Sequence, residues 1–380
     1  MSSSPLSPPS STPLSATGPY RASPAERCAW WLACLFLAVF LSCLRLTTTR
    51  PFRLTTFEQL VNFEAIEPFQ HRVLLPAIAA GVQQFAPVGE TLLFGLLEII
   101  AWMLLVGLAY RALVIFEIGR SEPVRRLLAF TVLVPMLLHL VAPDLQMAAG
   151  FSANHDLLDI GGWTPRPIFY YVYDLPAAMF TLALVLLIAR LVEQPTRQRF
   201  ASYLAVFALA TVNRETTLFL LPAFVLLLWP VLGARRCLLW ATLQAIVFLA
   251  IQLPLAELFA GNVNPNARLA HTPYEYHLGY NLEALANPLY AITYLARFCA
   301  ALYIPVLLWR RFLDRRLAGL LIAFALPLAA VAIVVGRMVE QRIFIEIVPL
   351  IWLAALQVIA ARTAGLGNDH AAGPAPRSDL

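Results

Sequence analysis

Long apolar runs recur along most of the chain and are separated by short polar segments. Such runs match helices that cross a hydrocarbon core about 30 Å thick, and they are continuous rather than alternating as in a membrane β-barrel. The pattern predicts an all-α, polytopic transmembrane helical bundle. We expect about ten spans, at residues 29–46, 92–116, 127–142, 172–191, 200–212, 216–232, 238–258, 288–309, 317–335 and 343–361.

One apolar run, 73–87, is too short to cross the membrane comfortably and is interrupted by Pro76, Gly81 and two glutamines. It predicts a juxtamembrane or re-entrant helix. Residues 1–25 are rich in Ser and Pro and poor in large apolar side chains, which is typical of a disordered segment. We therefore divide the chain into a disordered cytoplasmic tail (1–25), a transmembrane helical domain (26–362) and a disordered C-terminal tail (363–380).

The composition supports the membrane interpretation. The chain is 60% hydrophobic and only 13% charged, whereas soluble proteins carry about 25% charged residues. All 27 basic residues are arginine, which excludes Schiff-base chemistry and a Walker-type phosphate loop, since both need a lysine. The net charge of +5 fits basic cytoplasmic loops rather than a nucleic-acid surface. The five cysteines form no pair in an outer loop, so neither a disulfide framework nor a zinc site is indicated.

The arginines also predict the orientation of the chain. Loops rich in Lys and Arg stay on the cytoplasmic side, and four short loops alternate consistently when 73–87 is not counted as a span. Both termini are then cytoplasmic, and the protein is a multi-pass protein of the cell inner (plasma) membrane. The basic residues of these loops are Arg120, Arg125 and Arg126; Arg190, Arg197 and Arg199; Arg235 and Arg236; and Arg310, Arg311, Arg315 and Arg316.

Acids and histidines collect on the opposite, outer side. Groups able to do acid–base or metal chemistry are concentrated there, an imbalance that a purely structural membrane protein does not need. They are Glu64, Glu67, His71, Asp144, His155, Asp156, Asp159, Glu215, His271, Glu275, His277 and Glu340.

The first outer loop holds the densest group of these side chains. Glu64 and Glu67 are three residues apart and would share one face of a helix, which favours a general base or a divalent-cation site. His71 and Arg72 follow, and the guanidinium fork is suited to phosphate. The alternative is a solvated polar loop with an arginine at the headgroup level.

A second group, Asn213, Arg214, Glu215 and Thr216, interrupts a long apolar stretch. Ionisable groups at membrane depth usually line a cavity or form a pair. The alternative is a tight hairpin in which Arg214 and Glu215 cap helices.

A third group opens the last span with Arg337, Glu340, Arg342 and Glu346. Arg342 and Glu346 are four apart and would pair along a helix, leaving Arg337 to face a ligand. His155 and Asp156 lie in a long outer loop, and Asp174 lies just inside the next helix, where an acid needs a partner.

These features resemble the GT-C superfamily of integral membrane glycosyltransferases. The resemblance rests on the acidic first loop, the short helix at 73–87, and the motifs Gln70-His71-Arg72 and Asn213-Arg214-Glu215, and it covers most of 29–361. It implies a lipid-linked sugar phosphate as donor, a first-loop acid (Glu67 or Glu64) as base or metal anchor, and His71 as a helper. Arg72, Arg214 and Arg337 would hold the phosphate. Many members have adjacent acids in this loop, whereas this chain has Glu-x-x-Glu.

The leading hypothesis is a transferase that moves a sugar from a polyprenyl-phosphate donor to a glycan, lipid or protein acceptor on the outer face. No soluble cofactor is implied, and a divalent cation (Mg or Mn) remains an alternative for the acids. Two further hypotheses are a transporter or lipid or glycolipid flippase, and a non-catalytic scaffold of envelope glycan assembly. A transporter would place its site near the midplane on broken helices.

Overall fold

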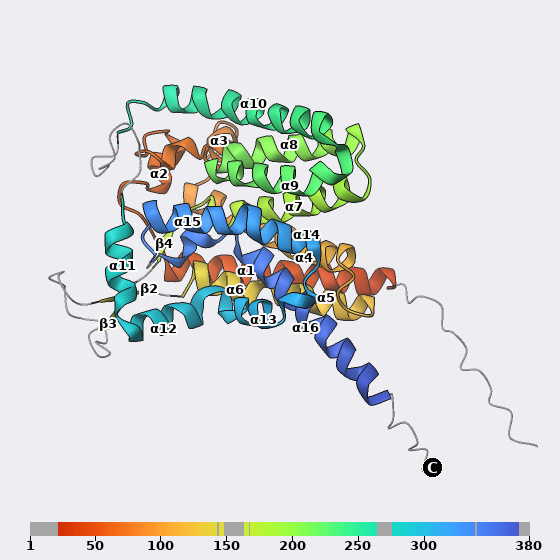
Figure 1. The fold of residues 1–380 in the computed structure, drawn as a ribbon. Helices are drawn as coiled ribbons and strands as arrows, with labels where there is room; N and C mark the ends of the chain where they lie inside the picture. Colours follow the sequence, from red (N-terminus) through yellow and green to blue (C-terminus); the bar gives the residue numbers. More distant parts are fainter. Residues whose placement is uncertain are drawn as a thin grey trace, which may run out of the picture.

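The protein is an all-α helical bundle (Figure 1). The computed structural model describes residues 22–142, 144–147, 163–166, 168–263, 276–338 and 340–371. His155, Asp156 and most of the two predicted tails lie outside the described residues. The last helix, α16 (Val348–Ala371), continues past residue 362, where the sequence placed the end of the transmembrane domain.

Within the described ranges, seven helices are long and apolar enough to cross a membrane, and the chain is accordingly a multi-helix membrane protein. Four are single helices, and three are made of two or three consecutive elements. They are α1 (Pro24–Thr48), α4 (Glu90–Ile115), α7 (Asp174–Glu193) and α10 (Ala234–Leu258), together with α5 (Glu122–Phe130) with α6 (Leu133–Leu140), η2 (Glu215–Phe219) with α9 (Leu220–Leu232), and α14 (Arg315–Leu320) with α15 (Leu326–Val335). A wider turn, η5 (Leu321–Ala325), joins α14 to α15.

The remaining three expected spans are shorter or broken. Helix α8 (Arg197–Asn213) has 17 residues, and the apolar part of α16 is also short. The stretch 288–309 is divided into α12 (Pro288–Arg297), a turn η3 (Phe298–Ala301) and α13 (Tyr303–Leu308). The division falls where Cys299 and Ala300 have positive φ angles of 50° and 54°, a conformation that no right-handed helix accommodates.

Short elements fill the space between the spans. They are α2 (Phe57–Val61), η1 (Phe69–His71), α3 (Leu74–Gln83), α11 (Leu278–Ala286), η4 (Arg310–Phe312) and η6 (Gln341–Phe344). Two small strand pairs complete the fold: β1 (Arg50–Pro51) runs parallel to β4 (Phe169–Tyr170), and β2 (Asp144–Met147) runs antiparallel to β3 (Trp163–Arg166). At ten residues, α3 is about 15 Å long, half of what a span needs.

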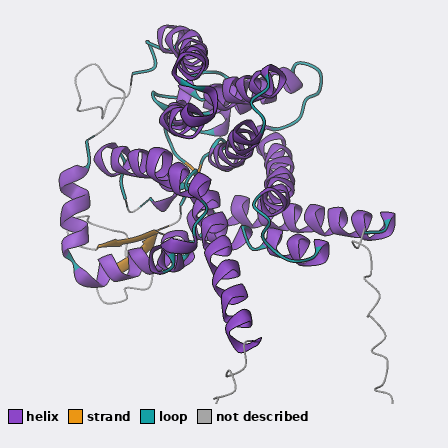
Figure 2. Ribbon diagram, turned by 45° about the vertical axis from the view of Figure 1, so that its right-hand side comes forward, coloured by secondary structure: helices purple, strands orange, loops and turns teal. Residues whose placement is uncertain are grey.

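Helix α7 lies at the centre of the packing. It packs on α4, α8 and α9, while α1 covers α4, and α10 lies on α8 and α9 (Figures 1 and 2). Its apolar window is 72% buried, against 11% for α10. The apolar side chains that α10 leaves exposed are those expected to face lipid. Glycine permits one close helix contact, since a Cβ on Gly107 of α4 would lie 3.2 Å from the Trp31 ring of α1.

The direction of the helices brings the polar breaks to one end of the bundle. Helices α1, α8, α10 and α15 end there, and α7, η2–α9 and α16 begin there (Figure 1). The first loop lies at the same end, because β1 pairs with β4 just before α7. Segments far apart in sequence are therefore neighbours in space.

This arrangement gives a topology test. In a cysteine-free background, Glu64→Cys should react with an impermeant thiol reagent on intact cells, and Arg315→Cys should react only after permeabilisation. Both side chains are exposed, and they lie at opposite ends of the bundle. Equal labelling of the two positions in intact cells would contradict the topology.

Candidate functional site

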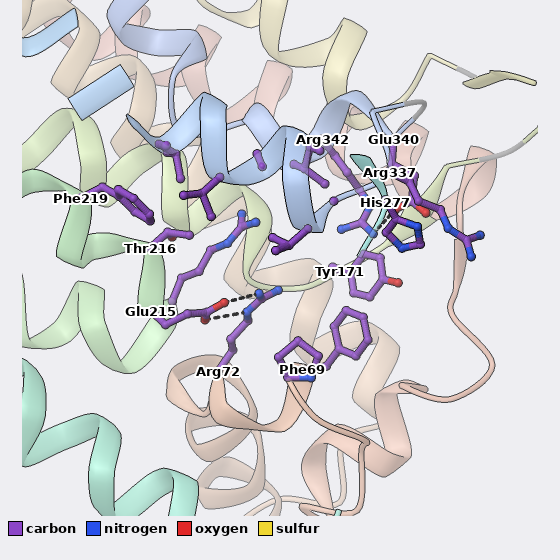
Figure 3. Close-up of a pocket in the computed structure, with 18 of the residues that line it drawn as sticks. Phe69, Arg72, Tyr171, Glu215, Thr216, Phe219, His277, Arg337, Glu340 and Arg342 are labelled. Atoms are coloured by element: carbon purple, nitrogen blue, oxygen red, sulfur yellow. Dashed lines mark hydrogen bonds and ion pairs between the residues drawn. The ribbon is translucent and has the colours of Figure 1, made fainter. Parts of the chain in front are cut away.

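A cavity of about 680 Å³ opens at the end of the bundle where the polar breaks meet (Figure 3). Its walls come from the first loop, the segment before α7, η2, α10, α15 and the segment that leads into η6. The polar residues of the lining are Arg72, Arg214, Glu215, Thr216, His277, Arg337, Glu340 and Arg342, with Tyr171 beside them.

An arginine–glutamate pair joins the first loop to the break between α8 and α9. Arg72 Nε donates to Glu215 Oε2 at 3.1 Å, and Arg72 Nη2 donates to Glu215 Oε1 at 2.6 Å. The guanidinium also lies over the Tyr173 ring, 4.5 Å from its centroid. Arg72 reaches this position because the chain leaves η1 there and turns into α3. This two-point contact fixes both residues in the cavity wall.

Asp174 is the acid on which three arginines converge. Its carboxylate lies 3.5 Å from Arg214 Nη1, 3.6 Å from Arg342 Nη1 and 4.0 Å from Arg45 Nη2. Asp174 is fully buried and is not part of the cavity lining. Asp174 therefore holds arginines in place from behind the cavity wall. The sequence had suggested a side chain that faces a ligand.

A second buried carboxylate, Glu98 of α4, lies deeper. Glu98 is 3.3 Å from Arg45 Nη1 and accepts a hydrogen bond of 3.1 Å from the Trp102 indole. The Tyr170 hydroxyl donates to its other oxygen. Arg45 lies over the Tyr170 ring at 4.2 Å and donates to the backbone carbonyl of Tyr171 at 3.0 Å. This cluster connects α1 and α4 to the segment that enters α7.

Glu346 and Arg342 do not pair with each other, contrary to the helical spacing. Glu346 lies 3.2 Å from Arg214 Nε and accepts a hydrogen bond of 2.6 Å from Thr216. Arg342 instead contacts Asp174 and donates to Glu340. The reason is local: Arg342 is in the tight turn η6, and the long helix begins only at Val348, so the two side chains are not on successive turns of one helix.

Arg342 is held on three sides. Its guanidinium lies 3.7 Å from the centroid of the Tyr171 ring, besides its contacts with Asp174 and Glu340. Burial disfavours the charged form, but Glu340, Tyr171 and Asp174 together keep the pKa of Arg342 above its ordinary value. The side chain is therefore a fixed cation in the cavity wall.

The mouth of the cavity carries Arg337, His277 and Glu340, which lie close together in Figure 3. Arg337 is exposed, and Glu340 is 21% exposed. The opposite part of the lining is apolar and comes mainly from η2, α10 and α15. Its members are Leu218, Phe219, Phe248, Leu328, Val331, Ala332, Val335 and Ile343.

The candidate base region of the first loop lies beside the cavity. Residues 64–67 are not helical, so the prediction that Glu64 and Glu67 share a helix face is wrong; the proline at 68 disfavours helical backbone for the residue before it. Glu64 is exposed, and Glu67 contacts His71 Nε2 at 3.2 Å. None of these three side chains is in the lining, although their neighbours Phe69 and Arg72 are.

Of the other predicted site residues, Asn213 is buried and donates to the Tyr173 carbonyl at 3.2 Å, which is a structural role at the end of α8. Arg214, Glu215, Arg337, Glu340 and Arg342 all line the cavity. His155 and Asp156 lie outside the described residues. Among the described residues, no three His, Cys, Asp or Glu side chains are grouped so as to hold a metal ion.

Arginines and carboxylates are equal in number in the cavity lining and the network behind it, within the described residues. Five arginines (45, 72, 214, 337 and 342) accompany five carboxylates (98, 174, 215, 340 and 346). Most of them are buried, and a buried charge needs an opposite charge nearby. An anion that enters the cavity must therefore compete with carboxylates that already occupy guanidinium groups.

Comparison with known proteins adds no relative. The chain matches no protein-family model, no curated protein and no solved structure. The interpretation of the site therefore rests on its own geometry.

Four contributors to the site were not in the predicted set. Arg45 and Glu98 form the deep pair, and Tyr171 and His277 line the cavity. Glu98 was recognisable as an acid inside a span, but its partner is 53 residues away in sequence. Position in the sequence gives no sign of such a contact.

The central position of Asp174 predicts a stability effect. Asp174→Ala removes an acid that three buried arginines contact. We expect the free energy of unfolding to fall by about 3–5 kcal/mol, the usual cost of removing one partner of a buried pair. The measurement is thermal unfolding of the detergent-solubilised full chain. Glu58→Ala, at an exposed position, is the control and should change stability little. An equal, small effect of both variants would contradict the structural role of Asp174.

Proposed function

We propose that the protein is an integral membrane glycosyltransferase that takes its sugar from a polyprenyl-phosphate donor. The observation that carries the proposal is the two-sided cavity, with arginines on one side and an apolar wall on the other. A lipid-linked sugar phosphate has the same division, because an anionic phosphate joins an apolar chain to a polar sugar.

The arginine side suits the phosphate. Arg72, Arg214 and Arg342 line the cavity and come from three separate segments, so they surround a bound group instead of touching it from one direction. Arginine forks bind phosphate oxygens through charge-assisted hydrogen bonds. Exposed Arg337 at the mouth adds positive charge where a ligand enters.

The apolar wall suits the lipid chain. Val331 of α15 and Leu218 of η2 line the cavity and are also 41% and 39% exposed. In a membrane, such surfaces face lipid, so the wall extends towards the bilayer. A chain that lies along it keeps its apolar surface out of water.

The aromatic residues beside the arginines suit the sugar. The rings of Phe69 and Tyr171 are stacked, with centroids 5.1 Å apart, and both line the cavity beside the arginines. In the reaction, the acceptor hydroxyl oxygen attacks the anomeric carbon, and the bond from that carbon to the phosphate oxygen breaks. The arginines stabilise the negative charge that remains on the phosphate.

The location of the charges favours a transferase over a transporter or flippase. A transporter places its substrate near the midplane, whereas Asp174, Arg214, Glu215 and Arg342 lie at the starts and ends of helices at one end of the bundle. A scaffold protein would tolerate substitution of the cavity arginines, which the following experiment tests.

The arginines are tested by substitution. Arg72→Gln and Arg342→Gln should each weaken binding of farnesyl phosphate to the solubilised full chain at least about tenfold, because a hydrogen bond to a charged group is lost. Transfer from a panel of polyprenyl-phosphate hexoses and pentoses, measured in proteoliposomes, should fall with it.

The matched control is Arg53→Gln, an exposed arginine of the same loop outside the cavity, which should keep wild-type binding. Thermal unfolding of each variant separates loss of binding from loss of folding. Unchanged binding and transfer in the folded Arg72 and Arg342 variants would refute the proposed function.

The apolar wall is tested by filling it. Ala332→Phe places a ring in the cavity. It should weaken binding of farnesyl phosphate and leave binding of inorganic phosphate unchanged, because only the lipid chain would contact the apolar wall. Ala330→Phe, on the exposed side of α15, is the control. If Ala332→Phe weakened binding of farnesyl phosphate and of inorganic phosphate equally, the apolar wall would not hold a lipid chain.

A further inference from the structure

The cavity lining contains the ion pair of Arg342 and Glu340. We infer that Arg342 exchanges Glu340 for the phosphate that leaves during sugar transfer, and that the released Glu340 accepts the proton of the acceptor hydroxyl. The inference rests on the proposed function and names its catalytic carboxylate.

Glu340 is the partner that is held least firmly. Asp174 and Glu346 are 0% and 3% exposed and each contacts at least two groups. Glu215 is bound through both oxygens by Arg72. Glu340 is 21% exposed, and its contact with Arg342 is through one oxygen. Its side chain can therefore turn towards the mouth while Asp174 still neutralises the buried Arg342.

Arg342 stays in position when Glu340 leaves. The Tyr171 ring and the carboxylate of Asp174 hold its guanidinium from two other sides. An anion that replaces Glu340 thus meets a cation whose orientation is already set. Such preorganised charge stabilises a developing negative charge without reorganisation at the moment of reaction.

The negative charge on the phosphate increases during transfer. This increase favours replacement of Glu340 by the phosphate at Arg342 while the bond to the sugar breaks. The donor is a phosphodiester with one negative charge. When its bond to the sugar breaks, the phosphate keeps the electron pair and becomes a monoester with a charge of about −1.5 to −2 at neutral pH. The dianion competes with Glu340 for Arg342 better than the diester does. Binding that strengthens as the bond breaks accelerates the reaction.

The released Glu340 is then suited to take the proton. Its surroundings are Arg342 of η6, Arg337 of the preceding segment, His277 before α11 and Tyr171 before α7. Asp174 lies on the other side of Arg342, outside the lining. Once the Arg342 contact is lost, the Glu340 oxygens are available to a hydrogen-bond donor at the mouth, and the acceptor hydroxyl is such a donor. The proton moves from the acceptor hydroxyl to a Glu340 oxygen as the hydroxyl oxygen bonds to the anomeric carbon.

Glu67 is a weaker candidate for this role. It lies outside the cavity lining and contacts His71, whereas Glu340 lies at the mouth beside the residues that would hold the phosphate. Glu215 lies inside the cavity but is fixed by its two-point contact with Arg72.

The exchange is tested with two probes that differ by one charge, farnesyl phosphate and its methyl ester. The wild-type full chain in detergent should bind farnesyl phosphate more tightly than the ester. In Glu340→Gln, Arg342 keeps Asp174 but loses the carboxylate that lines the cavity. Affinity for the ester should therefore rise about tenfold, and the difference in affinity between farnesyl phosphate and its ester should become smaller. Glu58→Gln is the exposed control. Ester affinity that does not rise in Glu340→Gln would overturn the exchange.

A double substitution tests whether the effect of Glu340→Gln on ester affinity depends on Arg342. If Glu340 acts through Arg342, Glu340→Gln should not raise ester affinity when Arg342→Gln is already present. The same gain in both backgrounds would overturn the assignment of Arg342 as the exchanging group.

Proton acceptance is tested by transfer from the polyprenyl-phosphate sugars in proteoliposomes. Glu340→Gln cannot accept the proton, so it should lose most of the transfer while it still binds the methyl ester, and Glu340→Asp should retain part of the transfer. Equal transfer rates in the wild type and Glu340→Gln would overturn the role of Glu340. Failure of the wild type to bind either probe would instead refute the proposed function itself.

Discussion

The end of the bundle depends on the neutralisation of buried charge around Asp174. Removal of an ionised group from water is costly unless an opposite charge and hydrogen bonds replace the solvent. Three arginines from α1, the end of α8 and η6 meet this one acid, so these elements have a fixed relative position. The deeper Arg45–Glu98 pair extends the same constraint to α4. The geometry of the cavity follows from this network, because the arginines that line it are also members of the network.

The first loop is a rigid part of the cavity wall. Gln70 is fully buried and accepts a hydrogen bond from the Ala65 backbone at 2.9 Å. Asn262, just after α10, donates to the carbonyls of Phe63 and Ala65 at 3.0 and 2.9 Å. These contacts fix the backbone on both sides of the loop and present Phe69 and Arg72 to the cavity. The acids that dominate the sequence of this loop, Glu64 and Glu67, point elsewhere or form local contacts.

A cavity whose charges are already balanced has a chemical consequence. Carboxylates already contact Arg72, Arg214 and Arg342 in its wall, so a ligand that binds these arginines must offer more than a carboxylate does. Phosphate does so, with more acceptor oxygens and, as a monoester, more charge. Selectivity for phosphate and catalysis then have the same origin, because both depend on phosphate replacing the carboxylate of Glu340 at Arg342. The absence of lysine fits this view, since only arginine offers a flat fork that two acceptors can share.

Hydropathy alone determines that the chain is a helical membrane protein, because backbone groups in lipid must be satisfied within each helix. The break at Asn213–Thr216 is equally clear from the sequence, since polar residues interrupt a long apolar stretch, and the structure has the end of α8 and the start of η2 there. The alternating direction of successive helices also groups the charged residues of the cavity, which are Arg72, Arg214, Glu215, Arg337, Glu340 and Arg342.

The pairing of these side chains was decided only by the tertiary structure. Helical spacing paired Arg342 with Glu346, but the turn η6 directs Arg342 to Asp174 and Glu340 and leaves Glu346 to Arg214. Partners of buried charges come from any element within a few ångströms, and that distance depends on packing, which no local pattern in the sequence encodes.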